Sequence, residues 1–160
     1  MEKDIKDKII FLDIDGVLCV FPEWQNSWVD NEKNLFSEPL IKNLKTILDA
    51  TGAKIVISSS WRLHKKSLLY LYNQLEKCGI LRSYIVGQTD DLSKHIRFSF
   101  YTELRWLEIK DYIDKNKIEK YIIIDDYDLE KYDKLHLVRT KRYMGLTAVL
   151  TNVCIKKLVG

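Results

Sequence analysis

Short apolar runs and stretches of helical periodicity alternate along the chain. Three runs are almost purely apolar and end at polar residues: Lys8 to Leu12, Lys54 to Ile57 and Tyr121 to Ile124. Runs of this length without polar alternation are typical of strands that are buried on both faces, as in a parallel sheet. Two other runs, residues 83–86 and 135–138, predict two further strands.

Between these runs, apolar residues recur at the spacing of a helix. One helix is expected after Ser37, which can cap it, with Pro39 in the first turn and Gly52 at its end. Further helices are expected over residues 63–78, over residues 102–115 and after Thr147. This alternation predicts an α/β sandwich with a mainly parallel sheet, whose ligand site lies at the carboxyl ends of the strands.

The composition fits one soluble globular domain over residues 1–160. Of the 160 residues, 46% are hydrophobic and 31% are charged, and no repeat or linker-like tract interrupts them. No apolar run approaches the roughly 20 residues that a membrane span needs, and the first residues lack the pattern of a secretory signal. The three cysteines are too few and too scattered for a disulfide framework, which favours a reduced, cytoplasmic location. The net charge of +3 permits an anionic ligand without demanding nucleic acid.

Two pairs of acidic residues follow predicted strands. Asp13 and Asp15 come directly after the first strand, with Gly16 allowing a sharp turn. Asp125 and Asp126 follow the apolar run YIII. Carboxylates gathered at one edge of a sheet repel one another unless a divalent cation neutralises them, and oxygen-only ligands favour Mg²⁺ over zinc. Capping of a turn explains either pair alone far better than it explains both pairs together, so the sequence predicts a magnesium site at this edge.

The order of motifs along the chain resembles that of haloacid dehalogenase (HAD) superfamily phosphohydrolases. The motif DxDGVL stands at residues 13–18, the hydroxyl-ended strand IVISSSWR at residues 55–62, and the pair DD at residues 125–126, with a basic residue before it. The short motifs SSSWR, RxxEI (residues 105–109) and GLT (residues 145–147) are similar to those of small capless HAD domains in RNA-repair proteins. The resemblance covers nearly the whole chain and implies a three-layer, Rossmann-like fold without a large cap domain.

The resemblance assigns the acids to a phosphatase mechanism. It implies that Asp13 is the nucleophile and forms an aspartyl-phosphate, and that Asp15 is the general acid and base. Dehalogenases of the superfamily lack that acid, so its presence disfavours hydrolysis of carbon–halogen bonds. The implied ligands of Mg²⁺ are Asp13, the backbone carbonyl of Asp15, and one or both of Asp125 and Asp126.

A hydroxyl group and a basic residue complete the expected site. Ser58 or Ser59 should donate a hydrogen bond to a phosphoryl oxygen, and the sequence leaves both open. Arg105, at the start of RxxEI, is expected to stabilise developing negative charge, although many HAD phosphatases have lysine in this role. Lys94 and Arg97 are its rivals, and a solvated place on a helix is the alternative for Arg105.

Three further features bear on the substrate. Gly16 lies in the turn beside the nucleophile and is expected to contact substrate. Arg62 follows the serine run, where it either reaches phosphate or caps a helix. The basic cluster RTKRY, residues 139–143, either tracks a nucleic-acid backbone or belongs to a solvated surface.

The site is expected to be open. Residues 19–37 are too few to enclose a metabolite and form a small flap, and the second place for an insertion, residues 81–101, is similarly short. An open site suits either a phosphate group on a macromolecule or a small phosphate monoester that does not need to be enclosed. Aromatic residues of the flap, Phe21, Trp24 and Trp28, either stack a nucleobase or pack the flap onto the core.

The leading hypothesis is a Mg²⁺-dependent phosphomonoesterase that works through Asp13, with nucleic-acid 3′ or 5′ phosphate ends as the first substrate class and no membrane partner. The alternative is a catalytically silent HAD-fold module that binds a phosphorylated partner, but such a module has no need for Asp15. A receiver-like phosphoacceptor domain is a third hypothesis. Receivers place their acidic pair and phosphoacceptor on different strands, whereas here the nucleophile and the acid share one turn.

Overall fold

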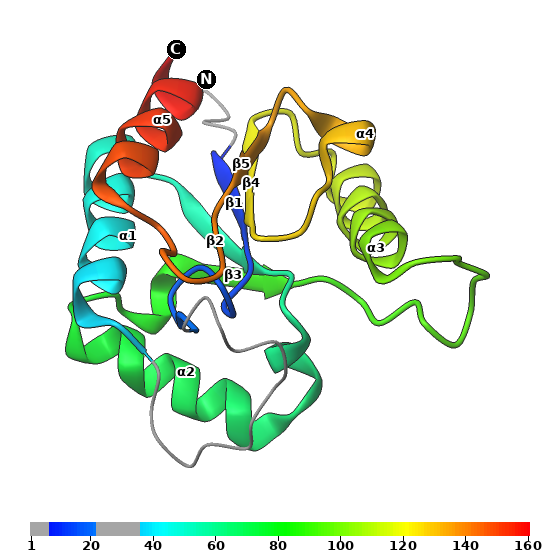
Figure 1. The fold of residues 1–160 in the computed structure, drawn as a ribbon, viewed down its shortest axis with the longest axis horizontal. Helices are drawn as coiled ribbons and strands as arrows, with labels where there is room; N and C mark the ends of the chain where they lie inside the picture. The colour runs from blue at the N-terminus through cyan, green and yellow to red at the C-terminus, as the bar shows by residue number, and fades with distance from the viewer. Residues whose placement is uncertain (1–6, 22–35) are drawn as a thin grey trace, which may run out of the picture.

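The computed structural model describes residues 7–21 and 36–160, which form a sheet between two layers of helices (Figure 1). The strands are β1 (Ile9–Leu12), β2 (Lys54–Ile57), β3 (Ile85–Gln88), β4 (Tyr121–Asp125) and β5 (Leu137–Arg139). The helices are α1 (Glu38–Thr51), α2 (Lys65–Lys77), α3 (Tyr101–Asn116), α4 (Glu130–Asp133) and α5 (Ala148–Val159). Within the described residues, no helix is long and apolar enough to span a membrane.

The strand order is β3-β2-β1-β4-β5, and every pairing is parallel. This is the order of a Rossmann-type sheet, in which the chain winds from the centre toward both edges. Leu12 of the central strand lies beside Ile57 of β2 on one side and beside Ile124 of β4 on the other. The residues that follow these three positions therefore emerge at the same edge, and the predicted fold class is confirmed.

Successive residues of the central strand enter different halves of the core. Ile10 and Leu12 pack with residues of α1, α2 and α5, whereas Ile9 and Phe11 pack on the side of α3. Figure 1 shows α1 and α5 along one side of the sheet and α3 on the other. A strand that is covered on both faces needs an apolar residue at every position, which is why these runs lack polar alternation.

Two boundaries near the serine run and α1 differ in detail from the expectation. The helix expected from residue 63 begins at Lys65, because Ser60–Leu63 form a 3₁₀ turn after β2. The Ser59 hydroxyl accepts the backbone N–H of Trp61 at 3.2 Å and so starts this turn. Ser37 precedes α1 as expected, but its side chain makes no capping hydrogen bond.

The edge strands lie later in the chain than expected. The strand predicted over residues 83–86 occupies 85–88, because Arg82–Tyr84 form a second 3₁₀ turn. The strand predicted over residues 135–138 occupies 137–139, because Leu135 is 72% exposed and stays outside the sheet. The single-turn helix α4 has too few residues to show helical periodicity in the sequence.

The expected flap, residues 19–37, is described only at its two ends. Cys19 pairs with Phe36 in an isolated bridge, and the Ser37 N–H donates to the Leu18 carbonyl at 3.0 Å. The chain therefore leaves and re-enters the described fold at neighbouring points, next to the turn that carries the first acidic pair.

Gly52 and Gly145 have nearly the same left-handed backbone but different surroundings. Substitutions at the two positions therefore distinguish backbone strain from steric crowding. Gly52 has φ +69° and Gly145 has φ +70°, but a Cβ on Gly52 would meet nothing within 4 Å, whereas one on Gly145 would lie 2.5 Å from the carbonyl oxygen of Val17. We expect Gly52→Ala to lower the free energy of unfolding by about 1–2 kcal/mol, the cost of left-handed backbone. Gly145→Ala should lower it by clearly more. Urea denaturation of both variants measures the difference. Equal losses of unfolding free energy would show that the backbone at Val17 can move away from the added Cβ at little cost.

Candidate active site

Three neighbouring strands deliver polar side chains to one edge of the sheet. Asp13 follows β1, Ser58 follows β2, and Asp125 is the last residue of β4. The residues two positions earlier in each strand, Phe11, Val56 and Ile123, pack on the face that α3 covers. Because side chains alternate with a period of two, the three polar side chains turn toward the same face.

Carboxyl groups gather at this edge. Asp13, Asp125 and Asp126 each offer one oxygen, and these oxygens all lie within 4.8 Å of one another. Gly16 allows the close approach of Asp126, because a Cβ at this glycine would lie 2.5 Å from an Asp126 carboxylate oxygen. The structure thus brings together acids from both predicted pairs, while the carboxyl group of Asp15 stays outside this cluster.

Helix α3 supplies a cation to the acidic cluster. Arg105 Nη1 lies 3.3 Å from Asp13 Oδ1 and also pairs with Asp125 Oδ2. Burial alone would lower the pKa of Arg105, but Asp125 and Asp13 together raise it above its usual range, so the guanidinium stays charged. The alternative of a solvated helix position does not apply, because Arg105 is buried; Lys94 and Arg97 are exposed on the segment before α3.

The cluster contains more acidic than basic side chains. Burial, together with the neighbouring charge of Asp13, raises the pKa of Asp126 to about 7. Burial also raises the pKa of Asp125 well above its usual range, against the opposite effect of Arg105. A divalent cation would supply the positive charge that one guanidinium cannot, and a ligand set of carboxylate oxygens fits Mg²⁺.

Asp15 lies in different surroundings. Its Oδ2 accepts the indole N–H of Trp61 at 2.8 Å, and the Trp61 ring contacts those of Phe36 and Tyr70, with centroids 5.3 and 6.5 Å away. Burial raises the pKa of Asp15 to about 7, although the Trp61 hydrogen bond acts to lower it. A carboxyl group with a pKa near 7 can give and take a proton at neutral pH. The sequence analysis assigned no role to Trp61, although this residue belongs to the SSSWR motif.

The two candidate serines differ in their bonding. Ser59 Oγ accepts the Trp61 N–H, whereas Ser58 Oγ is buried and has no hydrogen-bond partner in the part of the chain that the structure describes. Thr89 Oγ1, just after β3, is in the same state. Buried polar atoms in native proteins nearly always have a partner, so the Ser58 hydroxyl keeps a donor that a bound ligand could use. Ser58 is also the serine that shares its sheet face with Asp13.

Arg62, expected at the substrate, is bound within the protein. Its guanidinium donates to Glu108 Oε2 at 2.7 Å and to four backbone carbonyls, those of Ser58, Ser59, Thr89 and Asp90. A guanidinium has five N–H donors in all, so none is left for a substrate. Arg62 therefore ties the ends of β2 and β3 to α3. Glu108 was not singled out from the sequence, but in RxxEI it stands three residues after Arg105, on the same helix face.

The backbone groups of Gly16 are bound within the protein. Its N–H donates to the Cys19 carbonyl at 2.7 Å, and its carbonyl accepts the Thr140 hydroxyl at 2.6 Å. The backbone of Gly16 thus holds the turn after β1 and links it to the end of β5. Its amide is occupied by the protein, and its lack of a side chain serves the approach of Asp126.

The structure describes only some of the aromatic and basic residues that the sequence suggested for nucleic-acid contact. Trp24 and Trp28 lie outside the described residues. Phe21 is buried, with the Arg142 guanidinium 5.8 Å from its ring centroid, so it packs within the protein. In the cluster of residues 139–143, Arg139 pairs with Asp128 at 3.3 Å on the surface.

Comparison with known proteins agrees with this geometry. Residues 9–150 match the family described as HAD domain in Swiss Army Knife RNA repair proteins. The chain belongs to this family. No curated protein and no solved structure matches it. This HAD domain has a phosphohydrolase-type fold, and its buried aspartate cluster can hold the divalent metal that HAD-type domains typically use.

The raised pKa values predict how the metal-free HAD domain responds to pH. A carboxyl group whose pKa is raised on folding favours the folded state while protonated, so its contribution is lost as pH rises from about 4 to about 7. The metal-free protein should therefore have a higher Tm at pH 5 than at pH 8. Differential scanning calorimetry in a chelating buffer checks this, and a Tm that rises over the same range would contradict it.

Added Mg²⁺ should reverse this loss at pH 8. A ligand at about 100 times its Kd stabilises the folded state by about 2.7 kcal/mol, or roughly 5–10 °C in Tm for a domain of this size. Asp126→Asn should remove most of this shift. The matched control is Asp128→Asn, two residues later and exposed, which should keep it. Equal shifts in both variants would place the cation elsewhere.

Proposed function

We propose that this HAD domain is a Mg²⁺-dependent phosphomonoesterase that forms an aspartyl-phosphate at Asp13. The observation that carries the proposal is the contrast between two carboxyl groups on one turn. Asp13 is ion-paired with Arg105 at 3.3 Å, whereas Asp15 is held by Trp61 with its pKa raised to about 7. A charged nucleophile beside a carboxyl group that can carry a proton is what a two-step phosphoryl transfer requires.

In the first step, a carboxylate oxygen of Asp13 attacks phosphorus, and the bond from phosphorus to the leaving oxygen breaks. Arg105 stabilises negative charge on the phosphoryl oxygens, and Ser58 donates a hydrogen bond to one of them. Asp15 gives its proton to the leaving oxygen, so the alcohol departs neutral. Mg²⁺ would offset the repulsion between carboxylate and phosphate, with Asp13, Asp125, Asp126 and the Asp15 backbone carbonyl as its ligands.

In the second step, water attacks the phosphorus of the aspartyl-phosphate. Asp15, now ionised, takes a proton from the water as its oxygen bonds to phosphorus. The bond between phosphorus and the Asp13 oxygen breaks, which restores the carboxylate and releases inorganic phosphate. Asp15 ends protonated, ready for the next substrate.

We propose a phosphorylated nucleic-acid end as the substrate class. The family to which the chain belongs is described by its occurrence in RNA repair proteins. Within residues 7–21 and 36–160, no separate domain covers the carboxyl ends of the strands, which suits the end of a polymer better than an enclosed metabolite. The receiver-like alternative is disfavoured, since receivers have the strand order 2-1-3-4-5 rather than 3-2-1-4-5.

Asp13→Asn should abolish turnover and leave the fold intact, because the carboxamide has nearly the same shape but cannot attack phosphorus. Phosphate release from p-nitrophenyl phosphate, nucleotides and 3′- or 5′-phosphorylated oligonucleotides should fall by more than about 10³-fold. Asp114→Asn, an exposed position on α3, is the matched control and should retain activity. Undiminished release by Asp13→Asn would remove Asp13 as the nucleophile. If the wild-type protein releases nothing, the silent binding module becomes the better account.

Asp15→Asn should discriminate between leaving groups. Nitrophenolate leaves without a proton, whereas the alkoxide of a sugar must be protonated as the bond breaks. We therefore expect the loss in kcat to be about tenfold or more larger for a nucleotide than for p-nitrophenyl phosphate. Steady-state kinetics with both substrates measures the ratio. Equal losses would mean that Asp15 does not act as the general acid.

A further inference from the structure

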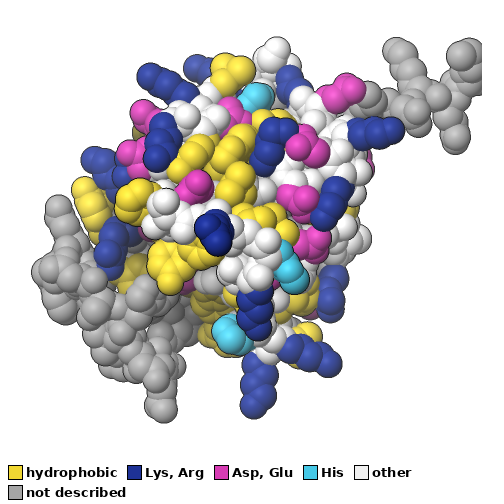
Figure 2. All heavy atoms as spheres, turned by 90° about the vertical axis from the view of Figure 1, so that its right-hand side faces the viewer, with side chains coloured by type: hydrophobic (Ala, Val, Ile, Leu, Met, Phe, Trp, Pro, Cys, Tyr) yellow, Lys and Arg dark blue, Asp and Glu magenta, His cyan; other side chains and the backbone are white. Residues whose placement is uncertain are grey.

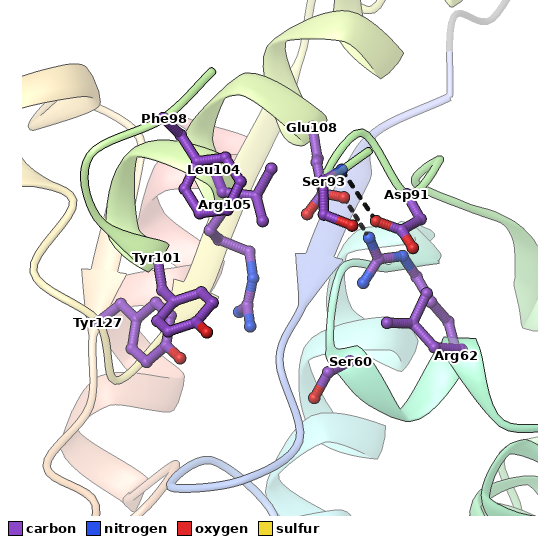
Figure 3. Close-up of a pocket in the computed structure, with 11 residues that line it drawn as sticks. Ser60, Arg62, Asp91, Ser93, Phe98, Tyr101, Leu104, Arg105, Glu108 and Tyr127 are labelled. Carbon is purple, nitrogen blue, oxygen red and sulfur yellow. Dashed lines mark hydrogen bonds and ion pairs between the residues drawn. The ribbon is translucent and has the colours of Figure 1, made fainter. Parts of the chain in front are cut away.

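A cleft beside the acidic cluster has no part in the mechanism above, apart from Arg105 in its lining. It has a volume of about 440 Å³ and lies between the start of α3 and the 3₁₀ turn after β2. In Figure 3, Phe98, Tyr101, Leu104 and Tyr127 lie on one side of this cleft, and Ser60, Arg62 and Asp91 lie on the other. Ligand pockets commonly have volumes of roughly 300–1,000 Å³, so the cleft can hold a group the size of a nucleoside.

The cleft is continuous with the candidate active site through Arg105. This residue lines the cleft, and in Figure 3 its guanidinium points into the gap between the two sides. The same guanidinium lies 3.3 Å from Asp13 and 4.8 Å from the centre of the Tyr127 ring. A phosphate that meets Asp13 therefore lies beside Arg105, which also lines the cleft.

The aromatic wall of the cleft is partly open to solvent. Tyr101 is 72% exposed, and its ring lies 6.1 Å from that of Phe98 at an angle of 44°. Neither residue belongs to the two hydrophobic cores of the described fold. Figure 2, which views the α3 side of the molecule, shows hydrophobic side chains gathered near the centre of this face, with both basic and acidic side chains around them. Exposed rings beside a phosphate site are suited to stacking on a flat base.

The other surroundings of the cleft are polar. Ser60 and Asp91 line it, and they offer hydrogen-bonding groups of the kind that bind base edges and sugar hydroxyls. Lys94 and Arg97 are exposed on the segment between β3 and α3, where they can attract the phosphates of a continuing strand. A base reaches an aromatic ring only when it is unstacked, so a single-stranded end fits this arrangement better than a duplex.

We infer that the cleft walled by Tyr101 and Phe98 receives the terminal base of a single-stranded polynucleotide whose phosphorylated end lies at Asp13. The position of the phosphate rests on the proposed function, whereas the base platform rests on the cleft itself. Tyr101 is the residue on which the base stacks, and Phe98 supports its ring from the side. Specificity for a polynucleotide end over a bare phosphomonoester then comes from the segment before α3.

Binding to the Asp13→Asn protein tests this inference without any need for turnover. The probes are a fluorescent single-stranded oligonucleotide with a terminal phosphate and the same oligonucleotide with its terminal base removed from the sugar. With Mg²⁺ present, anisotropy should give a Kd about 10- to 100-fold lower for the probe that keeps its base, as expected for one stacked base. Equal Kd values for the two probes, or no binding of either, would overturn the inference.

Variants at Tyr101 assign the effect to the cleft. Tyr101→Ala in the Asp13→Asn protein should bind both probes with the same, weaker affinity, whereas Tyr101→Phe should keep the preference for the base. Phe100→Ala is the matched control, because Phe100 is 66% exposed, precedes Tyr101 and does not line the cleft. It should bind like the parent. A base preference that survives Tyr101→Ala, or that Phe100→Ala also removes, would overturn the inference.

The two proposals can fail separately. Phosphate release by the wild-type protein without a base preference in binding would keep the phosphomonoesterase and overturn the base platform. A base preference that depends on Tyr101, in a protein that releases no phosphate, would support the platform and overturn the proposed catalysis. Unchanged thermal unfolding of the Tyr101 variants excludes misfolding as the cause of any loss.

Discussion

Carboxyl groups buried at one edge of a parallel sheet repel one another unless positive charge lies among them or some of them are protonated, and helix α3 provides Arg105 as a cation. Its side chain is buried and pairs with both Asp13 and Asp125. A buried charge that lost its partners would cost several kcal/mol, so the guanidinium and the two carboxylates hold one another in place. This pairing fastens α3 to the ends of β1 and β4 and holds Asp13 and Asp125 on either side of one guanidinium.

The same helix carries a second buried ion pair one turn further along. Glu108 binds Arg62, whose other donors are spent on the backbone at the ends of β2 and β3. Helix α3 is thus fastened at Arg105 to β1 and β4, and at Glu108 to β2 and β3. The carboxyl ends of these four strands are held against one helix face, so the polar groups of the site keep their spacing without a covering domain.

Most of the fold and the acidic part of the site could be predicted from the sequence, because both depend on local patterns. Buried strands read as apolar runs, and the acids stand at their ends. The partners of Arg62 and Gly16 could not be predicted, because they depend on which donors remain after tertiary packing. Arg62 has the same residue type and place as a phosphate-binding arginine, and only the contact with Glu108 on a distant helix shows that its donors are occupied. No role was predicted for Trp61 or Tyr101. The sequence alone does not distinguish an aromatic residue that packs in a core from one that hydrogen-bonds to a carboxylate or lines a cleft.

The bridge between Cys19 and Phe36 has a consequence for how this fold can vary. The two residues pair across the mouth of the segment that joins them, and Cys19 also bridges back to Asp15. When the ends of a connection are already held together, lengthening it costs little, because the entropy of closing a loop grows only with the logarithm of its length. The connection between Phe21, which is buried, and Phe36 is therefore a tolerant place for insertion of a further module, and one that would deliver it beside the acid-bearing turn rather than at a remote surface.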